Sequence, residues 1–134
     1  EGTTRRVVLQ HNYRVELLDV ATVRLDEYFA DHDGPISLIK MDIQGAEYAA
    51  LQGMRGLIER NPGVCLLIEF WPWGLKGAGV DPADLLSALL RLGFTLREVD
   101  GTRRSVTPVT PDALLAAYPP ETQLYTDLLC VREP

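Results

Sequence analysis

The chain has 134 residues, of which 46% are hydrophobic and 24% are charged, and this composition is typical of one folded domain rather than of a disordered segment. Its formal net charge of -6 argues against a nucleic-acid partner, because such a surface needs clustered lysine and arginine. No apolar run approaches the ~20 residues that cross a membrane, and the sequence begins without Met or an apolar signal segment, so we expect no membrane association.

The first expected elements lead up to a buried strand in the first half of the chain. Residues 15–23 have the composition of a strand, and a short helix with an acidic first turn is expected over residues 25–30. An apolar run over residues 37–43 predicts a buried strand that is interrupted only by a lysine and an aspartate. Apolar residues then recur at helical spacing over residues 45–60, where two glycines are expected to kink or split the helix.

The rest of the chain continues to alternate strands and helices. The expected elements are a buried strand over residues 64–70, a loop over 71–80, a helix that Asp81 caps and Gly93 ends, a strand over 94–99, an irregular loop over 102–111, a helix from Thr110 to Tyr118, and a last strand over 125–132. This alternation predicts an α/β fold with a parallel sheet that helices cover on both faces. Cys65 and Cys130 fall within two of these strands, which favours reduced core residues and a cytoplasmic location.

Carboxylates lie at the positions where open parallel sheets bind their ligands. Asp42 and Glu69 stand near the carboxyl ends of successive strands, and Glu47 opens the helix after the first of them. If the two strands are parallel neighbours, the three carboxylates converge on one crevice. They would then suit a general base, a clamp on substrate hydroxyls or a divalent cation. The alternative is a structural network in which Lys40 neutralises one carboxylate.

The tryptophans and histidines give weaker evidence for a functional site than the carboxylates do. Trp71 and Trp73 directly follow Glu69 and are expected either at the rim of this crevice or as a cap on the core. His11 and His32 lie far apart without a third partner, so the spacing supports neither a metal site nor a nucleophile triad.

One run of residues carries a family resemblance. Residues 38–47 read LIKMDIQGAE, residues 51–53 read LQG and residues 67–69 read LIE. Together with VRLDEY at residues 23–28, these segments resemble the FkbM family of S-adenosylmethionine-dependent methyltransferases. Gln44 stands where the family usually has Glu, and Arg24 where it usually has Thr.

The resemblance implies a Rossmann-like class I methyltransferase fold, with a mainly parallel sheet and an antiparallel last strand. It also implies methylation of a hydroxyl on a sugar or another small secondary metabolite. Among the candidate residues, Asp42, Lys40 and Glu69 would be catalytic. Asp42 would be the leading candidate for the acceptor contact or the base, Glu69 would help to shape the pocket, and Lys40 would neutralise or orient a carboxylate. Glu47, Trp71 and Trp73 would bind the substrate, and Asp42 and Gln44 would contact the cofactor.

The glycine-rich turn with which this fold binds S-adenosylmethionine is not found in the sequence. We therefore expect residues 1–134 to form one partial methyltransferase domain, the acceptor half, which alone binds the cofactor weakly or not at all and is inactive. The exposed edge of the central strand would be covered by residues 15–23, by a second copy of the chain or by the missing half. Two other functions stay open: a non-catalytic interaction or dimerisation module, and a metal-dependent hydrolase that uses the acidic cluster.

Overall fold

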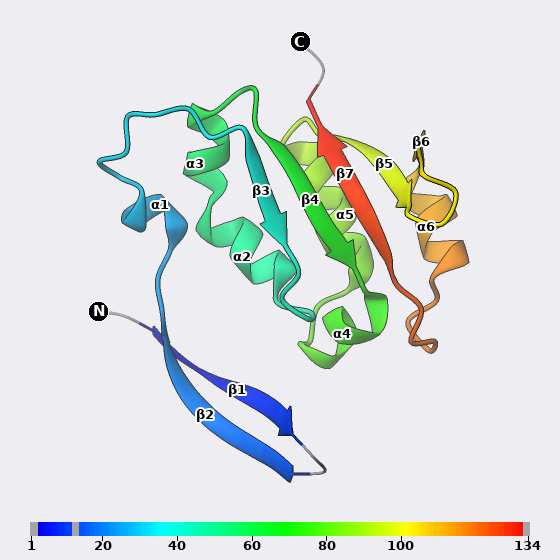
Figure 1. The fold of residues 1–134 in the computed structure, drawn as a ribbon, viewed down its shortest axis with the longest axis horizontal. Helices are drawn as coiled ribbons and strands as arrows, with labels where there is room; N and C mark the ends of the chain where they lie inside the picture. Colours follow the sequence, from blue (N-terminus) through cyan, green and yellow to red (C-terminus); the bar gives the residue numbers. More distant parts are fainter. Residues whose placement is uncertain (1–2, 12–13, 133–134) are drawn as a thin grey trace.

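The computed structural model describes residues 3–11 and 14–132, with side chains from Leu18 onward. Strands β1 (Thr3–His11) and β2 (Arg14–Thr22) pair antiparallel in a separate two-stranded sheet that extends away from the rest of the molecule (Figure 1). The strand expected over residues 15–23 is thus confirmed as β2. The sequence analysis missed β1, because its polar and apolar residues do not alternate regularly.

The main sheet has five strands. Its order is β3 (Leu38–Met41), β4 (Cys65–Phe70), β7 (Thr126–Val131), β5 (Thr95–Asp100) and β6 (Ser105–Pro108). Only β3 and β4 pair in parallel, and the other three pairings are antiparallel. The expected mainly parallel sheet is therefore not observed, although the antiparallel last strand is confirmed.

The path of the chain after β5 explains this difference. Strand β6 pairs antiparallel with β5 and so reverses the chain, and helix α6 (Pro111–Ala117) then lies between β6 and β7 in the sequence. Strand β7 therefore begins beside the carboxyl end of β5 and runs antiparallel to it. It lies in the sheet between β4 and β5. Strand β6 lies within residues 102–111, which were expected to form a loop. The strand was missed because it is short and ends at a proline.

Most of the helices follow the expected pattern. They are α1 (Leu25–Tyr28), α2 (Glu47–Gly53), α3 (Arg55–Arg60), α4 (Pro72–Gly77), α5 (Pro82–Arg91) and α6. The expected split of the helix after β3 is confirmed, because α2 and α3 meet at Met54. Asp81 caps α5 by accepting a hydrogen bond from the Ala83 N–H at 3.0 Å. Helix α4 lies in a segment expected to be a loop, although Pro72 at its first turn is a helix-start signal.

The core lies between the sheet and its helices. Alternate residues of β4 are buried, and they pack in one cluster with residues of α2, α3, α5 and α6; the cluster includes Leu66, Ile68, Phe70, Leu51, Ile58, Leu85, Leu89 and Leu114. The intervening residues Cys65 and Leu67 are only half-buried, and Figure 1 shows no helix of the described chain in front of β3, β4 and β7. The expected cover on both faces is thus not observed.

Strand β3 forms one edge of the sheet. Residues 14–22 pair with β1, so the expected cover of this edge by residues 15–23 is wrong. Among the described residues β3 has a strand partner on one side only, and Leu38 is 59% exposed. An exposed apolar edge of this kind favours pairing with another chain segment.

No helix within residues 3–11 and 14–132 is long and apolar enough to span a bilayer.

The two cysteines are expected to differ in reactivity. Both are free; Cys65 is half-buried, whereas Cys130 is buried and its burial raises the pKa of the thiol to about 12. The thiolate is the reactive form, so iodoacetamide at pH 8 should alkylate Cys65 well before Cys130. Mass spectrometry of the native and the unfolded protein measures this order. Equal labelling of both cysteines in the native protein would contradict it.

Candidate functional site

The structure brings Asp42 and Glu69 to the same end of the sheet, where β3 and β4 have their carboxyl ends. Strands β3 and β4 are parallel neighbours with Met41 opposite Ile68, so the residues that follow emerge side by side. Gln44 joins the two carboxylates: its Nε2 donates to Asp42 Oδ1 at 3.0 Å and to Glu69 Oε2 at 2.9 Å. The geometric expectation that parallel strands bring these acids together is confirmed.

Asp42 is held as a charged group. Lys40 Nζ lies 3.2 Å from Asp42 Oδ2, and both side chains are well exposed. The hydrogen bond from Lys40 and then that from Gln44 lower the pKa of Asp42 below its usual value. A carboxylate with a lowered pKa is a weak base, so the geometry favours Asp42 as a hydrogen-bond acceptor.

Glu69 has the opposite environment. Its pKa is raised, first because partial burial disfavours the charged form and then because Asp42, Glu47 and Asp127 repel it. A raised pKa makes this carboxylate the stronger base of the pair. Two neighbouring acids whose pKa values move apart are a pattern typical of catalytic sites.

Glu47 is placed differently from the other two acids. Its side chain is 0% exposed, its Oε1 accepts from the Ile43 N–H at 3.1 Å and its Oε2 accepts from the Gly45 N–H at 2.9 Å. The carboxylate thus fixes the turn between β3 and α2. Its contact with a substrate stays a prediction, and its negative charge contributes to the raised pKa of Glu69.

Close packing against α4 holds the same turn in place. Gly45 has φ +98°, and a Cβ at this position would lie 2.4 Å from the carbonyl oxygen of Gly74. A Cβ on Gly74 would in turn lie 2.2 Å from the Trp71 ring. The Trp71 ring therefore packs over the start of α4, while Trp73 is 45% exposed with its ring centroid 5.2 Å from that of Trp71. Substrate contacts of the two tryptophans stay predictions.

The sequence analysis missed the acidic and hydroxyl residues that β7, β5 and the end of α6 contribute at this end of the sheet. Asp127 lies opposite Glu69 in the antiparallel pairing of β4 with β7. Beyond it, Glu98 accepts hydrogen bonds from the hydroxyl of Tyr118 and, at 3.1 Å, from the hydroxyl of Thr126. Burial and then the bond to Glu98 raise the pKa of Tyr118. The long-range positions of β7 and of α6 bring these residues together, so no local sequence signal could identify them.

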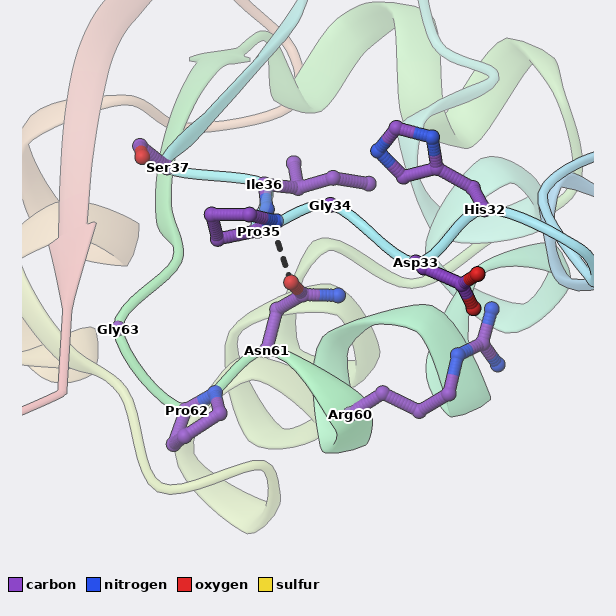
Figure 2. Close-up of a pocket in the computed structure, with 10 residues that line it drawn as sticks. All are labelled: His32, Asp33, Gly34, Pro35, Ile36, Ser37, Arg60, Asn61, Pro62 and Gly63. Atoms are coloured by element: carbon purple, nitrogen blue, oxygen red, sulfur yellow. Dashed lines mark hydrogen bonds between the residues drawn. The ribbon is translucent and has the colours of Figure 1, made fainter.

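A cavity lies at the opposite end of β3 and β4 from the acidic site. It has a volume of about 440 Å³ and is lined by residues 32–37, which precede β3, and by residues 60–63, which precede β4. Figure 2 shows the hydrogen bond that crosses it, from the Ile36 N–H to Asn61 Oδ1 at 2.8 Å. His32 lines this cavity, away from the acidic site. The side chain of His11 lies outside the described side chains.

No group of three or more His, Cys, Asp or Glu side chains is arranged to hold a metal ion within the part of the chain that the structure describes. Asp42 and Glu69 are joined by the neutral amide of Gln44. The chemistry that this arrangement supports is hydrogen bonding by Asp42 and proton transfer to Glu69.

Glutamate in place of Gln44 is expected to raise the pKa of both Asp42 and Glu69. The change removes two donated hydrogen bonds and adds a third negative charge between the carboxylates. Carbon-13 NMR of the side-chain carboxyl groups during a pH titration measures the shift. Gln52→Glu, at an exposed position on α2, is the matched control, and equal pKa values in wild type and Gln44→Glu would contradict the prediction.

Comparison with known proteins gives a match at the level of the family. The family model described as "Methyltransferase FkbM domain" matches residues 4–96, which include β3, the turn of Gln44 and Gly45, and β4. No curated protein and no solved structure matches the chain.

Proposed function

The chain belongs to the FkbM methyltransferase family, and from this we propose that it forms the acceptor side of an S-adenosylmethionine-dependent O-methyltransferase. The observation that carries the proposal is the pairing of an acid of lowered pKa, Asp42, with an acid of raised pKa, Glu69, at the ends of two parallel strands. The proposed substrate is a small molecule with a free hydroxyl, such as a sugar or another secondary metabolite.

Proton removal is the step that we assign to this chain. Glu69 would accept the proton of the acceptor hydroxyl while a bond forms between that oxygen and the methyl carbon. Asp42 would hold a neighbouring hydroxyl or polar group, and Lys40 would keep Asp42 charged and oriented through their ion pair. Bound S-adenosylmethionine would supply an electrophilic methyl group on a sulfonium sulfur, which leaves as a neutral thioether.

The described residues fit part of the cofactor. The free lone pairs of Asp42 and the amide of Gln44 can bind polar groups of S-adenosylmethionine next to the proposed base. The turns after β3, β4 and β5 read DIQGA, WPW and GTRR, and none is the glycine-rich turn that takes a nucleotide-like ligand. We therefore propose that most cofactor contacts come from outside these residues and that the 134-residue chain alone binds the cofactor weakly or not at all.

Methyl transfer from labelled S-adenosylmethionine tests the proposal. The assay uses the protein with its natural termini and a panel of hydroxylated small molecules, and compares wild type with Asp42→Asn. Loss of the charged acceptor should lower kcat/KM by about 10²-fold. Asp84→Asn, at an exposed position on α5, is the matched control and should keep wild-type activity. Equal rates in wild type and Asp42→Asn would remove the proposed role of Asp42, and transfer to no acceptor would remove the function.

The free edge of β3 favours a second candidate, an interaction module. Leu38 is 59% exposed on this edge, where another strand could pair. Light scattering over a range of concentrations tests the module: a dimer that Leu38→Lys converts to a monomer supports it, and a monomer at all concentrations contradicts it.

A further inference from the structure

A cavity of about 600 Å³ lies beside the acidic site. Its walls come from the end of β5 and the turn after it, from Tyr118 at the end of α6 and from the first residues of β7. Asp127 lines this cavity and also lies opposite Glu69 in the pairing of β4 with β7. The cavity and the proposed base Glu69 thus lie at the same end of the sheet, one beside β7 and the other on its neighbour β4.

Negative charge dominates the lining of this cavity. Glu98, Asp100 and Asp127 contribute three carboxylates, whereas Arg103 contributes one guanidinium. That guanidinium is already matched, because Arg103 Nη1 lies 3.6 Å from Asp100 Oδ2. A phosphate or carboxylate group on a ligand would meet uncompensated like charge here, so the cavity disfavours anions.

The remaining groups suit a ring that carries several hydroxyls. Tyr125 lines the cavity and is 61% exposed, so its aromatic ring is accessible to a ligand there. The carboxylate of Asp127 offers acceptor oxygens to a ligand, and Asp100 Oδ2 adds another, because only Asp100 Oδ1 accepts the Thr102 and Arg103 N–H groups. The hydroxyls of Tyr118 and Thr126 hold Glu98 in a fixed position. An aromatic face beside several hydrogen-bond acceptors fits a molecule with apolar C–H faces and a hydroxyl rim.

We propose that this cavity holds the body of the methyl acceptor and selects an uncharged polyhydroxylated ring, a sugar or a cyclitol, over a phosphorylated form of the same ring. This inference rests on the proposed function, because it takes the occupant to be the molecule whose hydroxyl reaches Glu69. It adds the position of the acceptor, its charge and the residues that select it.

Binding is tested without methyl transfer. The nitrogen-15-labelled full chain is titrated with methyl α-glucoside, with myo-inositol and with glucose 6-phosphate. At least one neutral probe should shift the amide signals of Thr102, Tyr125 and Asp127, and the phosphate should bind about tenfold more weakly than the best neutral probe. No shift of these signals with either neutral probe, or equal binding of glucose 6-phosphate, overturns the proposal.

Matched tyrosine variants localise the binding. Tyr125→Ala should weaken the best neutral probe about tenfold, while Tyr28→Ala, at a 70% exposed position on α1, should leave its binding unchanged. Circular dichroism melting of both variants shows whether the fold is retained. Unchanged binding by a folded Tyr125→Ala contradicts the proposal.

The transfer assay separates this inference from the proposed function. If methyl transfer occurs and Tyr125→Ala leaves the KM of the acceptor unchanged, the cavity proposal fails while the function stands. If no acceptor is methylated although neutral rings bind at the cavity, the function fails and the cavity remains a binding site for such rings.

Discussion

Glutamine in place of Glu69 is expected to slow methyl transfer by about 10²–10⁴-fold without loss of the fold. The amide keeps the size of the side chain, and its oxygen can still accept the 2.9 Å hydrogen bond from Gln44. The variant therefore removes the proposed proton acceptor and little else. Steady-state kinetics with labelled S-adenosylmethionine, on the protein with its natural termini, measures the effect as a loss of kcat.

The pH dependence of the same reaction gives an independent check. A base must be deprotonated, so kcat/KM should fall as the pH decreases through the raised pKa of Glu69. The acid limb of the profile is expected above pH 4.5, the ordinary value for this carboxyl group. Asp127→Asn removes one repelling charge and should shift the limb to lower pH. An unchanged acid limb in Glu69→Gln would show that another group takes the proton.

Alanine in place of Gly45 is expected to destabilise the protein by about 3 kcal/mol, a decrease in Tm of about 10 °C. The residue has φ +98°, which L side chains rarely adopt, and the new Cβ would lie 2.4 Å from the backbone oxygen of Gly74. The turn cannot move away from α4 without straining the two hydrogen bonds that Glu47 accepts from the Ile43 and Gly45 N–H groups. Thermal unfolding followed by circular dichroism measures the change.

Gly63→Ala is the matched control for this substitution. Nothing lies within 4 Å of a Cβ at Gly63, and its φ is not in the left-handed region, so its Tm should stay within a few degrees of wild type. Equal melting temperatures for Gly45→Ala and wild type would show that the turn relaxes freely.

Local sequence patterns were sufficient to predict one half of the acidic site. Two apolar runs joined by a helical segment predict parallel neighbours, and this alone places Asp42 and Glu69 at one edge. The role of Glu47 in fixing the turn was not predicted, because an acid in a first helical turn can face solvent or bond to nearby N–H groups.

The residues that β7 and the end of α6 add at this end of the sheet could not be predicted in this way. Asp127 lies next to Glu69 only because β7 enters between β4 and β5, and that position depends on pairing between distant parts of the chain. Tyr118 reaches Glu98 through the equally long-range placement of α6. Local propensity also failed for β6 and α4, which are short and contain proline or glycine. Propensity is a weak guide for short elements, whose stability comes mainly from tertiary contacts.

The central place of β7 has a consequence for biosynthesis. During translation β3, β4, β5 and β6 are all made before the strand that joins them. Until then the main sheet can exist only as two separate strand pairs, β3 with β4 and β5 with β6. The sheet can close only after residues 126–131 have left the ribosome. Nascent chains arrested before this point should therefore be protease-sensitive, and a stop codon directly ahead of β7 should prevent the five-stranded sheet from forming.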